Sequence, residues 1–171
     1  MKKIVTFVLL LIAMPVFAHP GHGTSPLSDG LLHPLTGLDH LLMLLGTGLL
    51  AGWSGRTLAV PAATLMAMVG GALLGYLLGD VTGVQSLIFA SLLALCAGVL
   101  LPQRRAMLVL AMPVFALFHG WAHGAEASPG GFWWFSAGFT LVSGLLLLAG
   151  FAAGRYVERT QLAAPARSTA R

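Results

Sequence analysis

The sequence predicts an all-α protein, a polytopic membrane bundle of about five transmembrane helices that follows a cleaved signal peptide. Of its 171 residues, 57% are hydrophobic and only 8% are charged, whereas roughly a quarter of the residues in a soluble domain are charged. The mean hydropathy of +0.89 also excludes intrinsic disorder, which requires low hydrophobicity and high net charge. A lipid bilayer suits this composition, and the length fits a single helical domain.

The first 18 residues have the three parts of a secretory signal peptide. Lys2 and Lys3 precede an apolar run over 4–14, and small residues follow at Val16 and Ala18. Cleavage after Ala18 would leave a periplasmic, histidine-containing arm over 19–30, which begins HPGHG. The alternative is an uncleaved anchor helix, but the apolar run is short for a span of about 20 residues.

Five apolar segments follow, and each is close to the roughly 17 to 25 residues that cross a bilayer as a helix. They cover residues 31–53, 58–78, 84–101, 106–122 and 132–153. The predicted bundle therefore occupies 31–154, and a cytoplasmic tail occupies 155–171. Gly71, Gly75 and Gly79 recur at every fourth residue, which lets another helix approach closely.

The distribution of arginine predicts the orientation of these segments. With the mature amino terminus outside and five spans, all seven arginines lie on the cytoplasmic side, as the positive-inside rule expects. The outer segments 79–83 and 123–131 contain no Lys or Arg and hold Asp80 and Glu126. We therefore expect a multi-pass protein of the bacterial cytoplasmic (inner) membrane, with a periplasmic amino terminus and a cytoplasmic carboxyl terminus.

Ionisable side chains gather at the outer ends of the first and fourth segments. On a continuous helix His33 and His40 are seven residues apart and share a face, about 10 Å apart in height. The fourth segment carries a second stripe of His119, His123 and Glu126. If the two helices pack together, we expect Asp39, His40 and His119 in a deep tier, with the other three residues nearer the mouth.

Ionisable residues inside a membrane bundle indicate function by default, and these six predict a metal or proton site. A lone interfacial histidine is usually only a satisfied polar tip, but no arginine lies on that side to pair with Asp39. Imidazole with carboxylate favours divalent first-row metals such as nickel, cobalt, zinc or copper. His19 and His22 are interpreted as a loose capture arm for the metal.

Two motifs resemble the HupE/UreJ family of nickel/cobalt permeases: HPLTGLDH at 33–40 and FHGWAHGAE at 118–126. The resemblance implies a secondary transporter of Ni²⁺ or Co²⁺, and not an enzyme, that supplies a metalloenzyme such as hydrogenase or urease. The metal ion is then the substrate, there is no organic cofactor, and maturation proteins are only indirect partners. The implied metal pathway comprises His33, Asp39, His40, His119, His123 and Glu126.

Several alternatives stay open at this point, including a membrane protein that binds and delivers metal without transporting it. Gly52 to Gly55 match the GxSG motif of intramembrane serine proteases, but Ser54 and His119 are predicted at opposite membrane faces, too far apart for proton transfer. A haem-binding bundle fits the carboxylates poorly. Nucleic acid is excluded because basic residues do not alternate with aromatic ones. The choice between nickel and cobalt, the energy coupling and a homo-oligomeric state are not decided.

Overall fold

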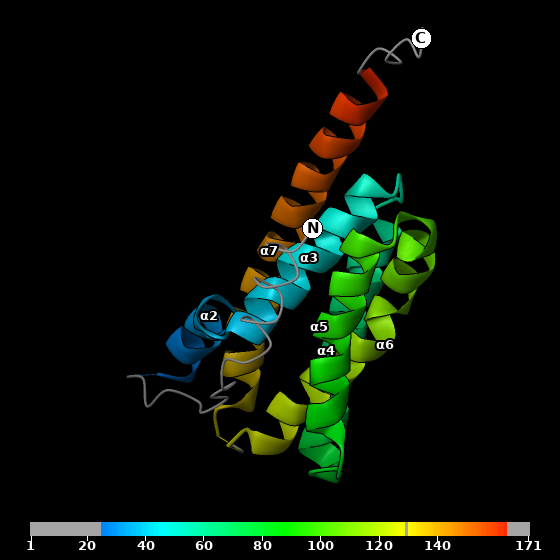
Figure 1. The fold of residues 1–171 in the computed structure, drawn as a ribbon. Helices are drawn as coiled ribbons and strands as arrows, with labels where there is room; N and C mark the ends of the chain where they lie inside the picture. Colours follow the sequence, from blue (N-terminus) through cyan, green and yellow to red (C-terminus); the bar gives the residue numbers. More distant parts are fainter. Residues whose placement is uncertain (1–24, 129, 164–171) are drawn as a thin grey trace, which may run out of the picture.

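The computed structural model describes residues 25–128 and 130–163, which form a bundle of helices without strands (Figure 1). The predicted helical membrane bundle is therefore confirmed. The predicted signal peptide over 1–18, His19 and His22 lie outside the described residues. The helices are α2 (Pro26–Thr36), α3 (Leu38–Trp53), α4 (Ala59–Leu78), α5 (Val84–Leu100), α6 (Pro102–Glu126) and α7 (Phe132–Ala163).

Three of the described helices, α4, α6 and α7, are long and apolar enough to cross a membrane alone. Helices α2 and α3 pass the same test only as a pair and are bent by 68° at their junction. Helix α5 is apolar but has only 17 residues, or about 25 Å of helix against a hydrocarbon core of about 30 Å. Length and composition thus support three spans, or four with the bent pair, and the predicted fifth depends on α5.

The first predicted span is not the continuous helix that the sequence analysis expected. Helix α2 begins at Pro26, where the Ser25 hydroxyl oxygen accepts a hydrogen bond from the Ser28 backbone N–H. It ends at Thr36, and Gly37 takes an extended conformation before α3 starts. A glycine close after Pro34 is a recognised helix breaker. Because α2 begins at Pro26, the last residues of the predicted arm over 19–30 are helical.

Two further boundaries differ from the prediction. Helix α6 covers 102–126 instead of 106–122, because Pro102 is well suited to the first turn of a helix. Helix α7 passes the predicted limit of the bundle at residue 154 and continues to Ala163. The segment assigned to the cytoplasmic tail therefore begins as an extension of α7 (Figure 1).

Close backbone contact joins α4 to α6. A side chain at Gly71 would clash with the carbonyl of Leu117, and one at Gly75 would clash with the carbonyl of Trp121. The predicted packing role of these two glycines is confirmed. Gly79 instead ends α4 with a φ of 81°, a left-handed conformation that glycine adopts without strain.

Helices α3 and α7 are joined in the same way. Gly48 and Gly52 of α3 lie against the backbone of α7, and Gly150 and Gly154 of α7 lie against the backbone of α3. Helix α2 packs on the first turns of α7, and α5 packs on α6 and α3. The molecule is thus two tightly joined helix pairs, and the core of buried side chains lies between them.

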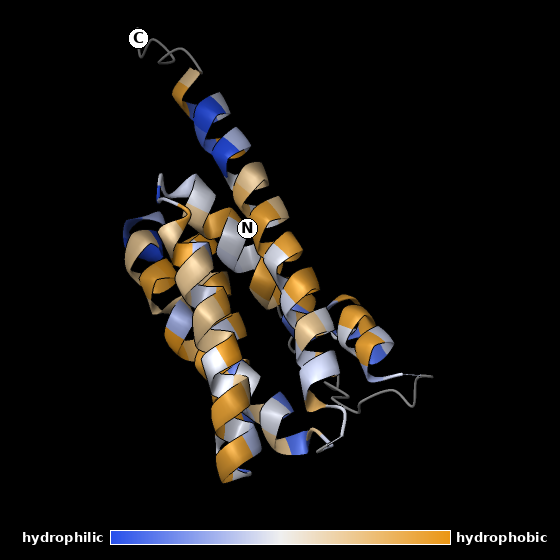
Figure 2. Ribbon diagram, turned by 180° about the vertical axis from the view of Figure 1, so that it is seen from behind, coloured by the Kyte–Doolittle hydropathy of each residue, from blue (hydrophilic) through white to orange (hydrophobic). Residues whose placement is uncertain are grey.

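Arginine-bearing segments meet at one end of the bundle. The Arg105 guanidinium lies 3.5 Å from the centroid of the Trp53 ring, and Trp53 Nε1 donates a hydrogen bond to Gln161 Oε1 at 2.8 Å. The carboxyl ends of α3 and α7 and the start of α6 therefore lie together. Figure 2 shows the hydrophilic stretch of α7 near this end. The predicted orientation requires such a gathering of arginine-bearing segments at one end.

Candidate metal site

Five predicted site residues converge at the opposite end of α3 and α6. They form two groups in which one potential ligand atom from each residue lies within 4.8 Å of the others. We call His33, His40 and His123 the His triad, and Asp39, His40 and His119 the Asp triad. The structure thus brings together five of the six residues predicted at the outer ends of the first and fourth segments.

The prediction that His33 and His40 lie on one continuous helix is wrong. His33 and His40 do not share a face of one helix, because the chain breaks at Gly37 and they belong to α2 and α3. The bend folds α2 back, so that the two ring centroids lie 5.0 Å apart instead of being separated by two helical turns. The expected grouping of Asp39, His40 and His119 is found, and His40 also belongs to the second group.

In the His triad, the imidazole rings lie close together in edge-to-face or tilted arrangements. His123 Nε2 lies 2.6 Å from His40 Nε2, and the His33 ring centroid lies 4.5 Å from that of His123. His33 Nε2 is buried and has no hydrogen-bond partner among the residues described. A buried polar atom without a partner is costly, so the triad holds an unused ligand atom.

In the Asp triad, backbone contact selects the ligand atom of His119. The Phe115 carbonyl can only accept a hydrogen bond, so His119 Nδ1, 3.2 Å away, carries the proton and donates it. His119 Nε2 then has a free lone pair, and it too is buried without a partner in the described part of the chain. Asp39 Oδ1 lies 3.1 Å from His40 Nδ1. Such orientation of a histidine through its second nitrogen is typical of metal ligands.

Two phenylalanines of α7, which were not among the predicted site residues, lie against the histidines. The Phe139 ring centroid lies 5.4 Å from that of His123, 5.7 Å from that of His40 and 5.9 Å from that of His33. Phe135 stacks on Phe139 at 5.8 Å. Their spacing of four residues is common in apolar helices, so no sequence signal marked them. Their rings exclude water and strengthen electrostatic interactions at the site.

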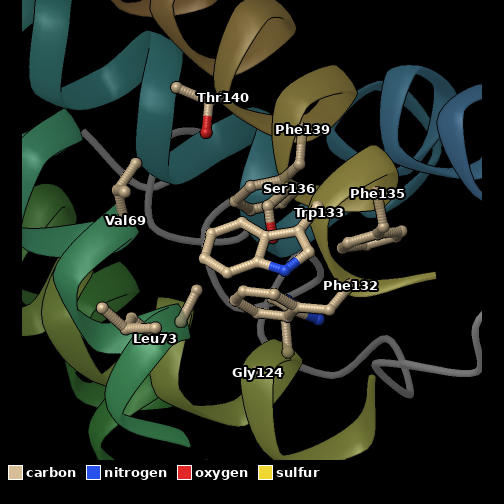
Figure 3. Close-up of a pocket in the computed structure, with 11 residues that line it drawn as sticks. Val69, Leu73, Gly124, Phe132, Trp133, Phe135, Ser136, Phe139 and Thr140 are labelled. Carbon is tan, nitrogen blue, oxygen red and sulfur yellow. The ribbon is translucent and has the colours of Figure 1, made fainter. Parts of the chain in front are cut away.

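A cavity of about 80 Å³ lies between α4, α6 and α7, next to the His triad. His123 and Phe139 form part of its wall, together with apolar side chains of α4 such as Val69 and Leu73. Figure 3 shows the rings of Phe132, Trp133, Phe135 and Phe139 gathered around this space. The cavity between these three helices therefore borders one potential metal ligand, His123.

Glu126 and Gly37 depart from the sequence analysis in opposite ways. Glu126 is exposed as the last residue of α6 and belongs to neither triad, so its place in a metal pathway stays a prediction.

Gly37 was not among the predicted site residues, yet a Cβ there would lie 3.1 Å from His40 Nδ1 and 3.2 Å from Asp39 Oδ1. The HPLTG sequence, with a proline and a glycine close together, was the available signal.

The serine protease alternative gains no support from the geometry. Ser54 follows α3 at the end that carries Trp53, whereas His40 lies in the first turn of the same helix. Fourteen residues of helix separate them by about 21 Å, far beyond the roughly 3 Å that a nucleophile and its base require.

Fold and site together define a helical membrane protein with a buried cluster of imidazole and carboxylate groups. Residues 7–170 match the model of the HupE / UreJ protein family. The chain is also 32% identical over 136 residues to "Protein HupE" of Rhizobium leguminosarum bv. viciae, an alignment that covers 71% of this chain and 67% of that protein. No solved structure matches it. The protein therefore belongs to the HupE/UreJ family, which confirms the resemblance seen in its motifs.

Proposed function

We propose that this protein is a permease that carries a divalent transition metal ion, nickel or cobalt, across the bacterial cytoplasmic membrane. The observation that carries the proposal is the pair of overlapping triads inside a membrane bundle. Membership of the HupE/UreJ family supports it, as does the nickel/cobalt transport that the motif resemblance implies. A metalloenzyme such as hydrogenase or urease would receive the metal.

The ligand types suit such an ion. Imidazole nitrogen and carboxylate oxygen bind divalent nickel, cobalt and zinc, whereas copper(I) prefers sulfur ligands. Cys96, the one cysteine of the sequence, lies on α5 and belongs to neither triad. The side chains that replace the water shell of the ion are therefore nitrogen and oxygen donors.

The charge of Asp39 points to a cationic occupant. A charged carboxylate buried away from water is costly unless it is paired, and Asp39 is only 4% exposed. Its close contact is the His40 imidazole, and the only salt bridge of an arginine in the described residues joins Arg155 to Glu158. A divalent cation in the Asp triad would offset the cost of this buried charge.

The direction of transport and its energy source are also part of the proposal. The predicted signal peptide and the arginine distribution support an orientation in which the histidine end faces the periplasm. The sequence contains no GxxxxGK[ST] motif for nucleotide binding. Movement then follows the metal gradient, the membrane potential or an exchange with protons, and His19 and His22 assist capture.

Uptake of radiolabelled nickel by cells that lack other nickel importers tests this function. Asp39→Ala, His40→Ala and His119→Ala should each abolish uptake at wild-type protein levels, because each removes a ligand. Thr64→Val is the matched control, since Thr64 is equally buried and its hydroxyl donates to the Val60 carbonyl of its own helix. His19→Ala and His22→Ala should only raise the nickel concentration required. Normal uptake by all three ligand variants would contradict the proposal.

A further inference from the structure

The two triads share one residue, His40, and this sharing limits how they can be occupied. We propose that the triads are alternate positions for a single metal ion, and that His40 passes the ion from one to the other. The inference rests on the proposed transport function and adds to it the number of ions bound and the order of their ligands.

His40 faces the two triads with different atoms. Its Nε2 lies 2.6 Å from Nε2 of His123 in the His triad. Its Nδ1 lies 3.1 Å from Oδ1 of Asp39 in the Asp triad. The two nitrogens occupy different edges of the same buried ring, so an ion in one triad binds a different atom of His40 from an ion in the other.

The chemistry of imidazole makes the two positions exclusive. A neutral imidazole has one nitrogen with a free lone pair, and the other nitrogen carries the proton. His40 can therefore complete one triad at a time. Two dications beside a single carboxylate would also repel each other strongly in this water-poor environment. One ion per chain is the occupancy that the geometry allows.

The surroundings indicate which position fills first. The His triad adjoins the cavity through His123, and its His33 is only partly buried. All members of the Asp triad are buried, and His119 is fully so. We therefore assign the His triad to loading. The ion then moves to the Asp triad, where the lone pair of His119 Nε2 and the Asp39 carboxylate replace His33 and His123. As the ion leaves Nε2 of His40 for Nδ1, the ring proton of His40 moves the other way, from Nδ1 to Nε2.

Metal binding by the purified full-length protein tests the exclusive arrangement, with Ni²⁺ alone as the probe. Equilibrium dialysis followed by metal analysis should give one ion per chain. His33→Ala removes only the His triad, and His119→Ala removes only the Asp triad. Each variant should still bind one ion, with affinity within about tenfold of wild type, whereas His40→Ala should lose about a hundredfold or more. Thr64→Val again serves as the control.

X-ray absorption spectroscopy of the nickel-loaded variants separates the two positions. In His119→Ala the ion should have three imidazole ligands, from His33, His40 and His123. In His33→Ala it should have two imidazoles, from His40 and His119, together with carboxylate oxygen. Circular dichroism of each variant checks that the helices are intact, so that a loss of ligand is not mistaken for a loss of fold.

Two ions per wild-type chain would overturn the inference, because the triads would then be independent. Loss of binding in His33→Ala and in His119→Ala as complete as that in His40→Ala would also overturn it, since the five side chains would form one site. A different result would contradict the proposed transport function. If one ion binds as described but reconstituted vesicles take up no nickel, transport is refuted and the exclusive positions stand.

Discussion

Gly37 illustrates how one residue positions several ligands. Its extended backbone ends α2 and lets α3 start in a new direction, which brings His33 back toward His40. Its missing side chain also leaves room for His40 Nδ1 and Asp39 Oδ1, which lie 3.1 and 3.2 Å from the position of a Cβ. Gly37 thus acts on both triads without offering a ligand.

We expect Gly37→Ala to weaken metal binding with little effect on stability. The added methyl group has to displace the Asp39 carboxylate or the His40 ring by a few tenths of an ångström, and both belong to the Asp triad. Changes next to metal ligands commonly cost about 10- to 100-fold in affinity. Nickel titration and thermal unfolding of the purified variant measure the two effects. An unchanged nickel affinity would show that the space at Gly37 is not required.

At the scale of whole helices, contact between backbones holds α4 against α6, and α6 carries two of the four clustered histidines. His119 and His123 project from the same part of α6 that packs on α4 through Gly71 and Gly75. The rigidity of this helix pair therefore fixes the position of two ligands. In lipid, such close packing is a main source of helix association, because lipid tails are as apolar as the side chains.

Two neighbouring glycines of α4 provide a matched test of this packing. Gly71→Ala should destabilise the protein by about 1 to 3 kcal/mol, because the Cβ meets the Leu117 carbonyl of α6. A Cβ at Gly70 meets no atom within 4 Å, so Gly70→Ala should be neutral or stabilising by about 0.5 to 1 kcal/mol. Thermal unfolding in detergent compares the two variants. Equal stability would mean that the α4–α6 contact contributes little.

The helices were predictable from sequence to different extents, for physical reasons. Long apolar runs and regular spacing identified α4, α7 and the His119–His123 stripe of α6, because these helices follow local rules. The path of the first segment was not predicted, because hydropathy does not reveal a 68° bend between two apolar helices. The cover formed by Phe135 and Phe139 depends on how α7 packs against other helices, which no local pattern in one sequence records.

In the part of the chain that the structure describes, Arg105 and Arg155 lie at the end of the bundle opposite the metal cluster. Arg105 contacts Trp53 where α3 ends, and Arg155 lies on the extension of α7 beside it. The histidine cluster lies where α3 begins and α6 ends. This polarity matches the orientation expected from the positive-inside rule, with the histidine end toward the periplasm.

Reporter fusions test that orientation directly. A reporter that is active only outside the cytoplasm should be silent when fused after Arg171, and it should be active when inserted near Ser128 between α6 and α7. The same insertion made beside Arg56, between α3 and α4, should be silent and serves as the internal control. Activity at the carboxyl terminus combined with silence near Ser128 would reverse the membrane orientation proposed for this chain.

Nickel flux through the purified protein in sealed vesicles is the most direct test of the proposed permease function. It also separates a permease from a membrane protein that binds metal and delivers it without transport. Vesicles that contain the wild-type protein should accumulate radiolabelled nickel down an imposed gradient, and competing cobalt should slow this uptake. Vesicles with His40→Ala should match empty vesicles, because that substitution removes a ligand from both triads. Nickel binding without accumulation by the wild-type protein would contradict the account.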